Sequence, residues 1–215
     1  LYVTGYVDSE VEFEAGGQKV RLIQKQDYMN GSLMNSSENS VHQTVNDITS
    51  TYANKPDFRK YVFTMQMQEN TDYTINFRIP DWINGMARVY INDELAVQTD
   101  TADQFLSFER TWKDGDRIIL LFPIGLKFIP LPDDSDMGAF RYGPDVLAGI
   151  TQQERVLKLE SDEPVEELSA DTERQWGEFR TFYRTENQDP GISFMKLNEV
   201  GYEPYQIYFK VKRKE

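Results

Sequence analysis

The chain has 215 residues, which is enough for one large domain or two small ones, since domains usually run about 100 to 200 residues. Its net charge of −13 argues against nucleic acid and membrane surfaces as partners, because both need clustered Lys and Arg. The sequence has no cysteine and one histidine, His42, which excludes disulfides, thiol nucleophiles and thiolate or paired-histidine zinc sites. His42 is therefore the one ordinary candidate for proton transfer near neutral pH, and the catalytic inventory is small.

Short alternating strands dominate the first part of the chain. The chain starts inside an apparent strand at residues 1–6, which suggests a piece of a longer polypeptide. Residues 11–13 and 20–23, joined by Ala15-Gly16-Gly17, predict a hairpin. The Asn- and Ser-rich residues 29–40 predict an exposed loop, and a strand is expected at 41–48.

Six further strands are expected before residue 123. Residues 61–68 and 71–79 both alternate apolar and polar side chains, and the short polar connection predicts that they pair as an antiparallel hairpin. A second hairpin is expected at 87–97, around Asn92-Asp93-Glu94. A strand at 105–112 leads through a turn into Ile118-Ile119-Leu120-Leu121-Phe122, whose five consecutive apolar side chains predict burial on both faces.

Prolines and an acidic run mark residues 123–136 as the boundary between two units, which we place at 1–128 and 129–215. Beyond the boundary, strands are expected at 138–142, 146–150, 156–159, 192–197 and 205–212, with at most a short helix at 170–177. The sequence therefore predicts an all-β chain made of two β-sandwich-like units in series, with antiparallel strands.

Several polar side chains are candidates for chemistry, and each has a structural interpretation that we favour. Asp133, Asp134 and Asp136 have the oxygen ligands of a calcium site but are expected to be a solvated linker. Glu12, Glu14 and Glu109 are of the type that glycosidases use as acid and nucleophile, but sequence does not give their spacing. His42 is expected to be exposed, and Arg78 to tether its strand to a carboxylate.

The three tryptophans are candidates for stacking on a sugar ring, because an indole face matches the apolar face of a saccharide. Trp82 and Trp112 each end a strand and are expected to pack in the core. Trp176 lies in a polar stretch and is the best candidate for carbohydrate binding.

Four segments in order carry a resemblance to a known family. They are Phe77-Arg78-Ile79-Pro80-Asp81-Trp82, Arg88-Val89-Tyr90-Ile91-Asn92-Asp93-Glu94, Phe105 to Asp116 with its Trp-Lys-Asp-Gly-Asp ending, and Phe140-Arg141-Tyr142-Gly143-Pro144-Asp145-Val146-Leu147. The series resembles the C-terminal β region of glycoside hydrolase family 127, the β-L-arabinofuranosidase type. Two positions depart from the family: Asp93 replaces the glycine of an Asn-Gly turn, and Asp145 stands where an apolar residue is usual.

The resemblance implies a non-catalytic fragment of a larger hydrolase. In that family an (α/α)6 barrel on the N-terminal side holds zinc with three cysteines and a glutamate, and with no cysteine and no such barrel this chain has none of those positions. The implied role is to brace the parent catalytic barrel and shape substrate access, with no cofactor in the fragment itself and zinc belonging to the barrel. The location is undetermined, although a periplasmic or secreted parent protein would fit.

Two alternatives stay open on the sequence alone. One is an autonomous carbohydrate-binding module whose partner is a plant-type oligosaccharide such as arabinan. The other is an independent hydrolase that uses only carboxylates, which would need two close carboxyls in a concave pocket.

Overall fold

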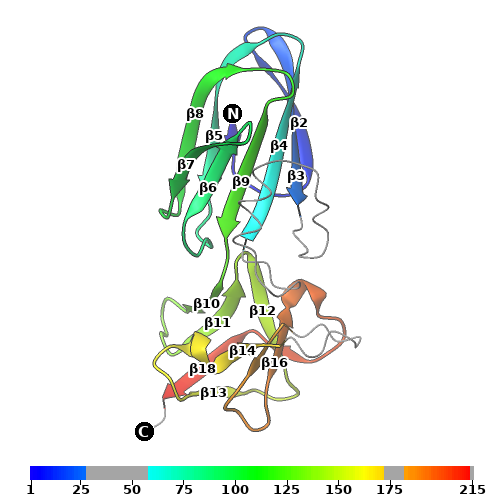
Figure 1. Cartoon of the computed structure of the whole chain (residues 1–215). Coiled ribbons are helices and arrows are strands. Elements are labelled where there is room, and N and C mark those ends of the chain that lie inside the picture. The colour runs from blue at the N-terminus through cyan, green and yellow to red at the C-terminus, as the bar shows by residue number, and fades with distance from the viewer. Residues whose placement is uncertain (28–57, 172–181, 214–215) are drawn as a thin grey trace, which may run out of the picture. The chain divides into compact units, whose positions relative to one another are not determined.

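The computed structural model describes residues 1–27, 58–171 and 182–213 (Figure 1). Within these residues the chain is all-β, as predicted, and its only helices are two short 3-10 segments, η1 (Pro164–Glu167) and η2 (Leu197–Glu199). The chain divides into two compact units, unit 1 (Leu1–Ile124) and unit 2 (Gly125–Glu215). In the described part, no helix has the length and apolar character needed to cross a membrane.

Unit 1 is a sandwich of two sheets. One sheet has six strands in the order β2-β3-β4-β9-β6-β7, and the other has three in the order β1-β5-β8. Buried side chains from both sheets form one core, in which the rings of Phe63 and Phe77 lie 4.9 Å apart. The strands are β1 (Tyr2–Val3), β2 (Ser9–Ala15), β3 (Gln18–Asp27), β4 (Phe58–Met67), β5 (Thr71–Ile79), β6 (Ala87–Ile91), β7 (Glu94–Thr99), β8 (Gln104–Trp112) and β9 (Arg117–Pro123).

The predicted pairing of residues 61–68 with 71–79 is wrong. β4 pairs with β3 and β9, whereas β5 pairs with β1 and β8 in the other sheet. The three residues between β4 and β5 therefore cross from one sheet to the other. This arrangement lets the apolar faces of both strands meet across the core, while a hairpin would have placed both in the same sheet. Alternation alone predicts which face is buried but not the partner strand.

The two other predicted hairpins are confirmed. β2 pairs with β3 around Gly16 and Gly17, and β6 pairs with β7 around Asn92 and Asp93. All four central residues have positive φ, between 50° and 80°. Two positive φ values suit the right-handed twist of a hairpin, and Asn and Asp tolerate that backbone better than other side chains. Asp93 can therefore replace the glycine of the family's turn.

Strand β9 is buried on both faces, as its five consecutive apolar residues predict. Ile118, Leu120 and Phe122 belong to the sandwich core. Ile119 and Leu121 lie on the opposite face of the sheet, in a second cluster with Tyr90 of β6, against which Phe58 and Val62 of β4 pack.

Unit 2 is built on one nine-stranded sheet, with β13-β18-β11-β12-β16-β15-β14 as its main path, β10 beside β11 and β17 beside β12. The aromatic rings of Phe140, Phe194 and Phe209 contact one another in its core. The strands are β10 (Leu126–Pro130), β11 (Met137–Tyr142), β12 (Asp145–Ile150), β13 (Val156–Leu159), β14 (Leu168–Ala170), β15 (Tyr183–Thr185), β16 (Ser193–Lys196), β17 (Tyr205–Gln206) and β18 (Tyr208–Arg213).

The strands predicted in the second half are present, but the one expected at 205–212 is broken at Ile207 into β17 and β18. The side chain of Gln206 stabilises the backbone at this interruption. Its Nε2 donates to the carbonyls of Tyr208 (2.7 Å) and Arg155 (2.9 Å), and its Oε1 accepts the Arg155 amide (2.8 Å). β10 spans the predicted boundary at 128/129 and belongs to unit 2.

Candidate functional site

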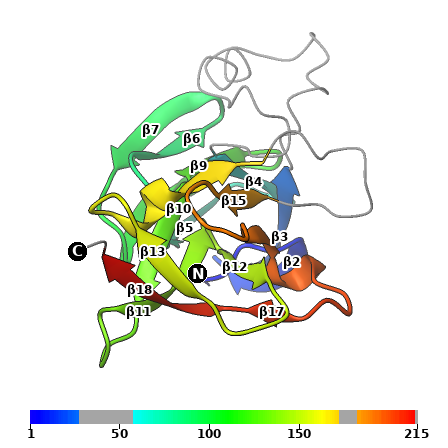
Figure 2. The same ribbon diagram turned by 90° about the horizontal axis from the view of Figure 1, so that it is seen from below.

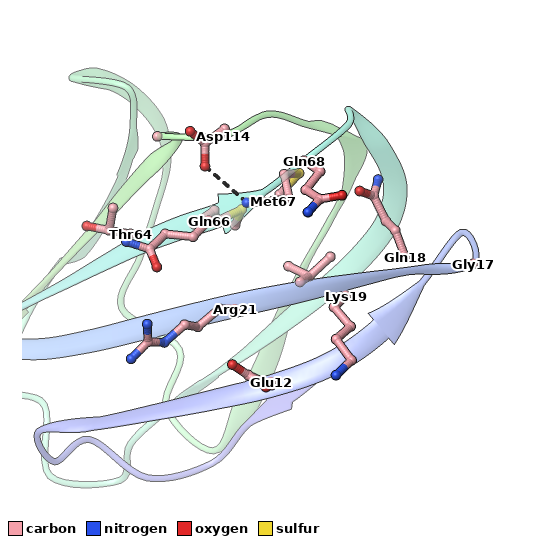
Figure 3. A pocket seen from close by; sticks show the side chains of 13 residues that line it. Glu12, Gly17, Gln18, Lys19, Arg21, Thr64, Gln66, Met67, Gln68 and Asp114 are labelled. Carbon is pink, nitrogen blue, oxygen red and sulfur yellow. Dashed lines mark hydrogen bonds between the residues drawn. The ribbon is translucent and has the colours of Figure 1, made fainter.

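The candidate site is a groove of about 760 Å³ in unit 1, at one end of the six-stranded sheet (Figure 3). Strands β2, β3 and β4 and the turn between β8 and β9 supply its walls. The lining residues that carry polar side chains are Glu12, Gln18, Lys19, Arg21, Thr64, Gln66, Gln68 and Asp114.

Hydrogen bonds to the backbone of β4 fix the rim of the groove. Asp114 Oδ1 accepts the amide of Met67 (3.0 Å), and the Gly115 amide donates to the carbonyl of Met65 (2.9 Å), so the β8–β9 turn is fastened along β4. Beneath the rim, the Tyr73 hydroxyl donates to Met65 Sδ at 3.1 Å. Burial, and to a smaller degree the Asp116 carboxylate, raises the pKa of Tyr73, so this hydroxyl stays protonated near neutral pH.

Other side chains on the wall are available to a ligand. Gln66 on β4 and Gln68 just after its end are exposed, and Glu12 and Lys19 are exposed on the β2–β3 hairpin. None of these four takes part in the hydrogen bonds or ion pairs found within the described residues. Arg21 forms an ion pair with Glu10, with 2.5 Å between Nη2 and Oε2. Amides, a carboxylate and a cation together can donate to and accept from hydroxyl groups.

The sequence segments at 88–94 and 105–116 meet beside this groove in a hydrogen-bonded network. The buried carboxylate of Asp116 accepts the Lys113 amide (2.9 Å) and Asn92 Nδ2 (2.8 Å). Asn92 Oδ1 in turn accepts the Arg117 amide at 2.9 Å. The Asn-Asp and Gly-Asp motifs of the resemblance therefore lock two turns together, and their role is structural.

The described tryptophans pack in the core, as predicted. Trp112 is 0% exposed, and its indole N–H donates to the carbonyl of Tyr73 at 3.0 Å. Trp82 is partly buried and lies edge-on to Phe122 with 5.6 Å between the ring centroids. Trp176 and His42 lie outside the described residues, so the carbohydrate-binding role of Trp176 stays a prediction.

The candidate glycosidase carboxylates do not form one site. Glu12 and Glu14 lie on β2, an exposed edge strand of the six-stranded sheet, whereas Glu109 lies on β8 of the other sheet. A general acid needs an enclosed environment that favours its protonated form, and none of these three exposed side chains has one. Arg78 makes its predicted tether, since its Nη2 lies 2.9 Å from Asp103 Oδ1.

The acidic linker residues serve a local turn. Asp134 Oδ1 accepts the amide of Asp136 at 3.0 Å, and its carbonyl accepts that of Met137 at 3.1 Å. Throughout the described ranges, no group of three or more His, Asp or Glu side chains is arranged to hold a metal ion.

Unit 2 has a buried carboxylate that fastens a loop. Glu167 is 1% exposed, and its Oε1 accepts the amides of Glu160 (2.6 Å) and Ser161 (2.8 Å). Burial alone would raise the pKa of Glu167, but the hydrogen bonds from Ser161, Glu160 and Asn187 outweigh it and hold that pKa below its usual value. Asp145, the second departure from the family pattern, forms a largely covered ion pair with Lys196 at 3.5 Å.

Sequence reasoning did not nominate the groove. The alternation of β4 predicts that Gln66 and Gln68 face away from the core, and this was the available signal. The sequence does not show that Lys19 and Arg21 lie beside these glutamines. They do so only because β3 pairs with β4, although residues 28–57 separate the two strands in the sequence.

Comparison with known proteins gives the family. A family model described as "Beta-L-arabinofuranosidase, GH127 middle domain" matches residues 1–124. Among solved structures, a GH127 β-L-arabinofuranosidase from Geobacillus stearothermophilus T6 is similar over 98% of this chain and 33% of its own, with a TM-score of 0.58 and 18% identity. A GH127 β-arabinofuranosidase is similar over 98% of this chain and 34% of its own, with a TM-score of 0.58 and 16% identity. A structure described as a glycoside hydrolase is similar over 99% of this chain and 36% of its own, with a TM-score of 0.57 and 12% identity. No curated protein matches.

The fold and the matched segment define a β-sandwich module of a glycoside hydrolase family. Because the family model covers more than half of the chain, this chain belongs to glycoside hydrolase family 127. It spans about a third of the length of the solved structures that it resembles. The matching model is that of the middle domain, so the predicted C-terminal placement is not confirmed.

Proposed function

We propose that this chain is the non-catalytic accessory β region of a larger family 127 protein and that it braces the catalytic (α/α)6 barrel. The match of residues 1–124 to the family's middle domain carries this proposal. The absence of cysteine from the sequence agrees with it, because the zinc that the family resemblance implies then belongs to the barrel. In this arrangement unit 1 is the middle domain, and unit 2 follows it.

Unit 1 offers a surface for such a contact. Tyr2 of β1 and Phe105 of β8 are 66% and 43% exposed, and their rings touch edge to face with 5.3 Å between centroids. Both belong to the three-stranded sheet. An exposed aromatic pair of this kind is typical of the central residues of protein interfaces. We assign this pair to the contact with the catalytic barrel.

The chain alone is expected to show no turnover of aryl α- and β-glycosides, with or without added zinc.

Expressed with the catalytic domain, it is expected to co-purify with that domain and to raise its melting temperature. Phe105→Ser should weaken the association roughly tenfold, because a buried aromatic contact is worth about 1.5 kcal/mol or more. Leu95→Ser is the matched control, since Leu95 is 52% exposed on β7 of the other sheet.

Two results would count against this role. Activity of the chain that survives repurification and disappears in Glu12→Gln would make it a hydrolase. A catalytic domain that is equally stable and active without the chain would leave bracing without support.

Carbohydrate binding without catalysis is the second candidate function, and the groove on β3 and β4 favours it. Its free amides suit a neutral oligosaccharide, but none of the described residues that line it is aromatic, so the affinity should be weak. Titration of the chain with arabinan oligosaccharides, followed by NMR, is expected to shift the side-chain amide signals of Gln66 and Gln68. The double variant Gln66→Ala/Gln68→Ala should lose several-fold in affinity, about 1 kcal/mol in total.

Gln98→Ala is the control for that titration, because Gln98 is exposed on β7 of the same sheet but does not line the groove. Equal losses in the control and in the double variant, or no shift at all with arabinan, would remove the groove as a saccharide site.

A further inference from the structure

The strands on one side of the unit 2 sheet carry basic side chains and no acidic ones. Strands β10, β11, β18 and β13 lie side by side in the sheet, and their sequences contain no Asp or Glu (Figure 2). This is unusual in a chain with 36 acidic and 23 basic residues. We call the central part of this surface the basic face. It consists of Tyr208, Lys210 and Lys212 of β18 and Lys158 of β13.

Strand alternation places these four side chains together. Phe209 and Leu157 are 0% exposed in the core, so their neighbours along each strand point outward. Tyr208 is 53% exposed, and the three lysines are exposed. Lys158 and Lys212 are direct partners in the parallel pairing of β13 and β18, and successive outward residues of β18 lie about 7 Å apart.

Among the described residues, the ammonium groups of the basic face have no hydrogen-bond or ion-pair partner. None of them takes part in an ion pair among the described residues. Asp136 adjoins the face, since its carbonyl accepts the Val211 amide at 2.7 Å, but its carboxylate makes no ion pair with these lysines. The side chains next to Tyr208 and Lys210 across the β11 pairing are Ala139 and Met137, which carry no charge.

We propose that the basic face binds an acidic oligosaccharide, one whose sugar rings carry carboxylates. Tyr208 offers an exposed ring for the apolar face of a sugar, and ammonium groups on the same face donate charge-assisted hydrogen bonds to carboxylates. The ring and the cations are close enough to act on one sugar residue and its neighbour along a chain. This site is separate from the groove of unit 1.

Two features favour a saccharide over a nucleic acid. A nucleic-acid duplex carries one negative charge per about 1.7 Å of helix axis, more than a sugar chain with one carboxylate per ring, so the net charge of −13 repels the duplex more strongly. Nucleic-acid surfaces also use many cations, whereas the basic face presents three free lysines beside one ring. The choice of a saccharide further rests on the proposed function within a glycoside hydrolase.

The test is titration of the full chain with tetragalacturonate, an uncharged tetrasaccharide and a short single-stranded DNA. Tetragalacturonate is expected to bind best and to weaken as ionic strength rises. Lys210→Gln/Lys212→Gln should lower its affinity roughly tenfold, since each exposed ion pair is worth up to about 1 kcal/mol. Tyr208→Ala should lower it roughly fivefold through loss of stacking.

Matched controls separate the site from general effects of charge and aromaticity. Lys113→Gln removes a charge from an exposed turn of unit 1, and Tyr202→Ala removes a fully exposed ring outside the strands. Both should bind as the unmodified chain does.

Losses in the controls equal to those in the variants, no binding of tetragalacturonate, or tighter binding of the uncharged sugar or the DNA would overturn the proposal. The outcome is independent of the bracing test, because it needs only the isolated chain.

Discussion

Replacing Trp112 by alanine is expected to lower the free energy of unfolding of unit 1 by about 3 to 5 kcal/mol. The indole is fully buried, its N–H donates to the Tyr73 carbonyl, and the Arg110 guanidinium lies 5.1 Å from its ring centroid. Removing it leaves a cavity and an unpaired carbonyl. Whole domains are stable by about 5 to 15 kcal/mol, so much of the stability of unit 1 would be lost. Urea denaturation followed by circular dichroism measures the change.

Trp112→Phe separates packing from hydrogen bonding. Phenylalanine keeps an aromatic ring in the core but removes the donor to Tyr73, so a loss of about 1 to 2 kcal/mol is expected. If both variants were equally unstable, the hydrogen bond rather than the buried ring would dominate at this position.

Asp116→Ala is expected to lower the free energy of unfolding by about 3 kcal/mol, because it leaves two hydrogen-bond donors without an acceptor in a largely buried place. Its carboxylate accepts the Lys113 amide and the side chain of Asn92, which itself holds the Arg117 amide. The loss should loosen both the β8–β9 turn and the β6–β7 turn. Hydrogen exchange measured residue by residue is expected to speed up at Lys113 and Arg117 together.

Asp114→Ala is the matched control in the same turn. Asp114 is exposed and accepts one amide, that of Met67, so its loss should cost about 1 kcal/mol and leave the β6–β7 turn protected. Equal effects of the two variants, or exchange that stays slow at Arg117 in Asp116→Ala, would contradict the network between the two turns.

The sequence predicts the strands and their buried faces well, because alternation reflects which side of a strand meets the core. Phe63, Phe77 and the run from Ile118 to Phe122 are buried as expected. It does not predict which strand lies beside which. A polar connection of three residues, such as 68–70, is compatible both with a hairpin and with a crossing between sheets. The packing of Phe63 on Phe77 across the core favours the crossing.

The candidate sites were less predictable for a related reason. Tryptophan is the residue type that most strongly indicates sugar stacking in a sequence, whereas the exposed aromatic on the basic face is Tyr208. The lysines of that face come from segments more than fifty residues apart and meet only because β13 pairs with β18 in parallel. In contrast, Asn92 and Asp116 were found through the family resemblance, although their contact with each other required the structure.

The edge of the six-stranded sheet is also shaped by its sequence. Strand β2 ends the sheet and leaves one side of its backbone without a partner strand in the described residues. Such an edge invites the strand of another molecule to add to it. The outward side chains of β2 are Glu10, Glu12 and Glu14, all exposed. If the β2 strand of a second copy paired with this edge, the carboxylates of the two strands would lie within about 5 Å of each other. The repulsion between these like charges therefore disfavours polymerisation through this edge.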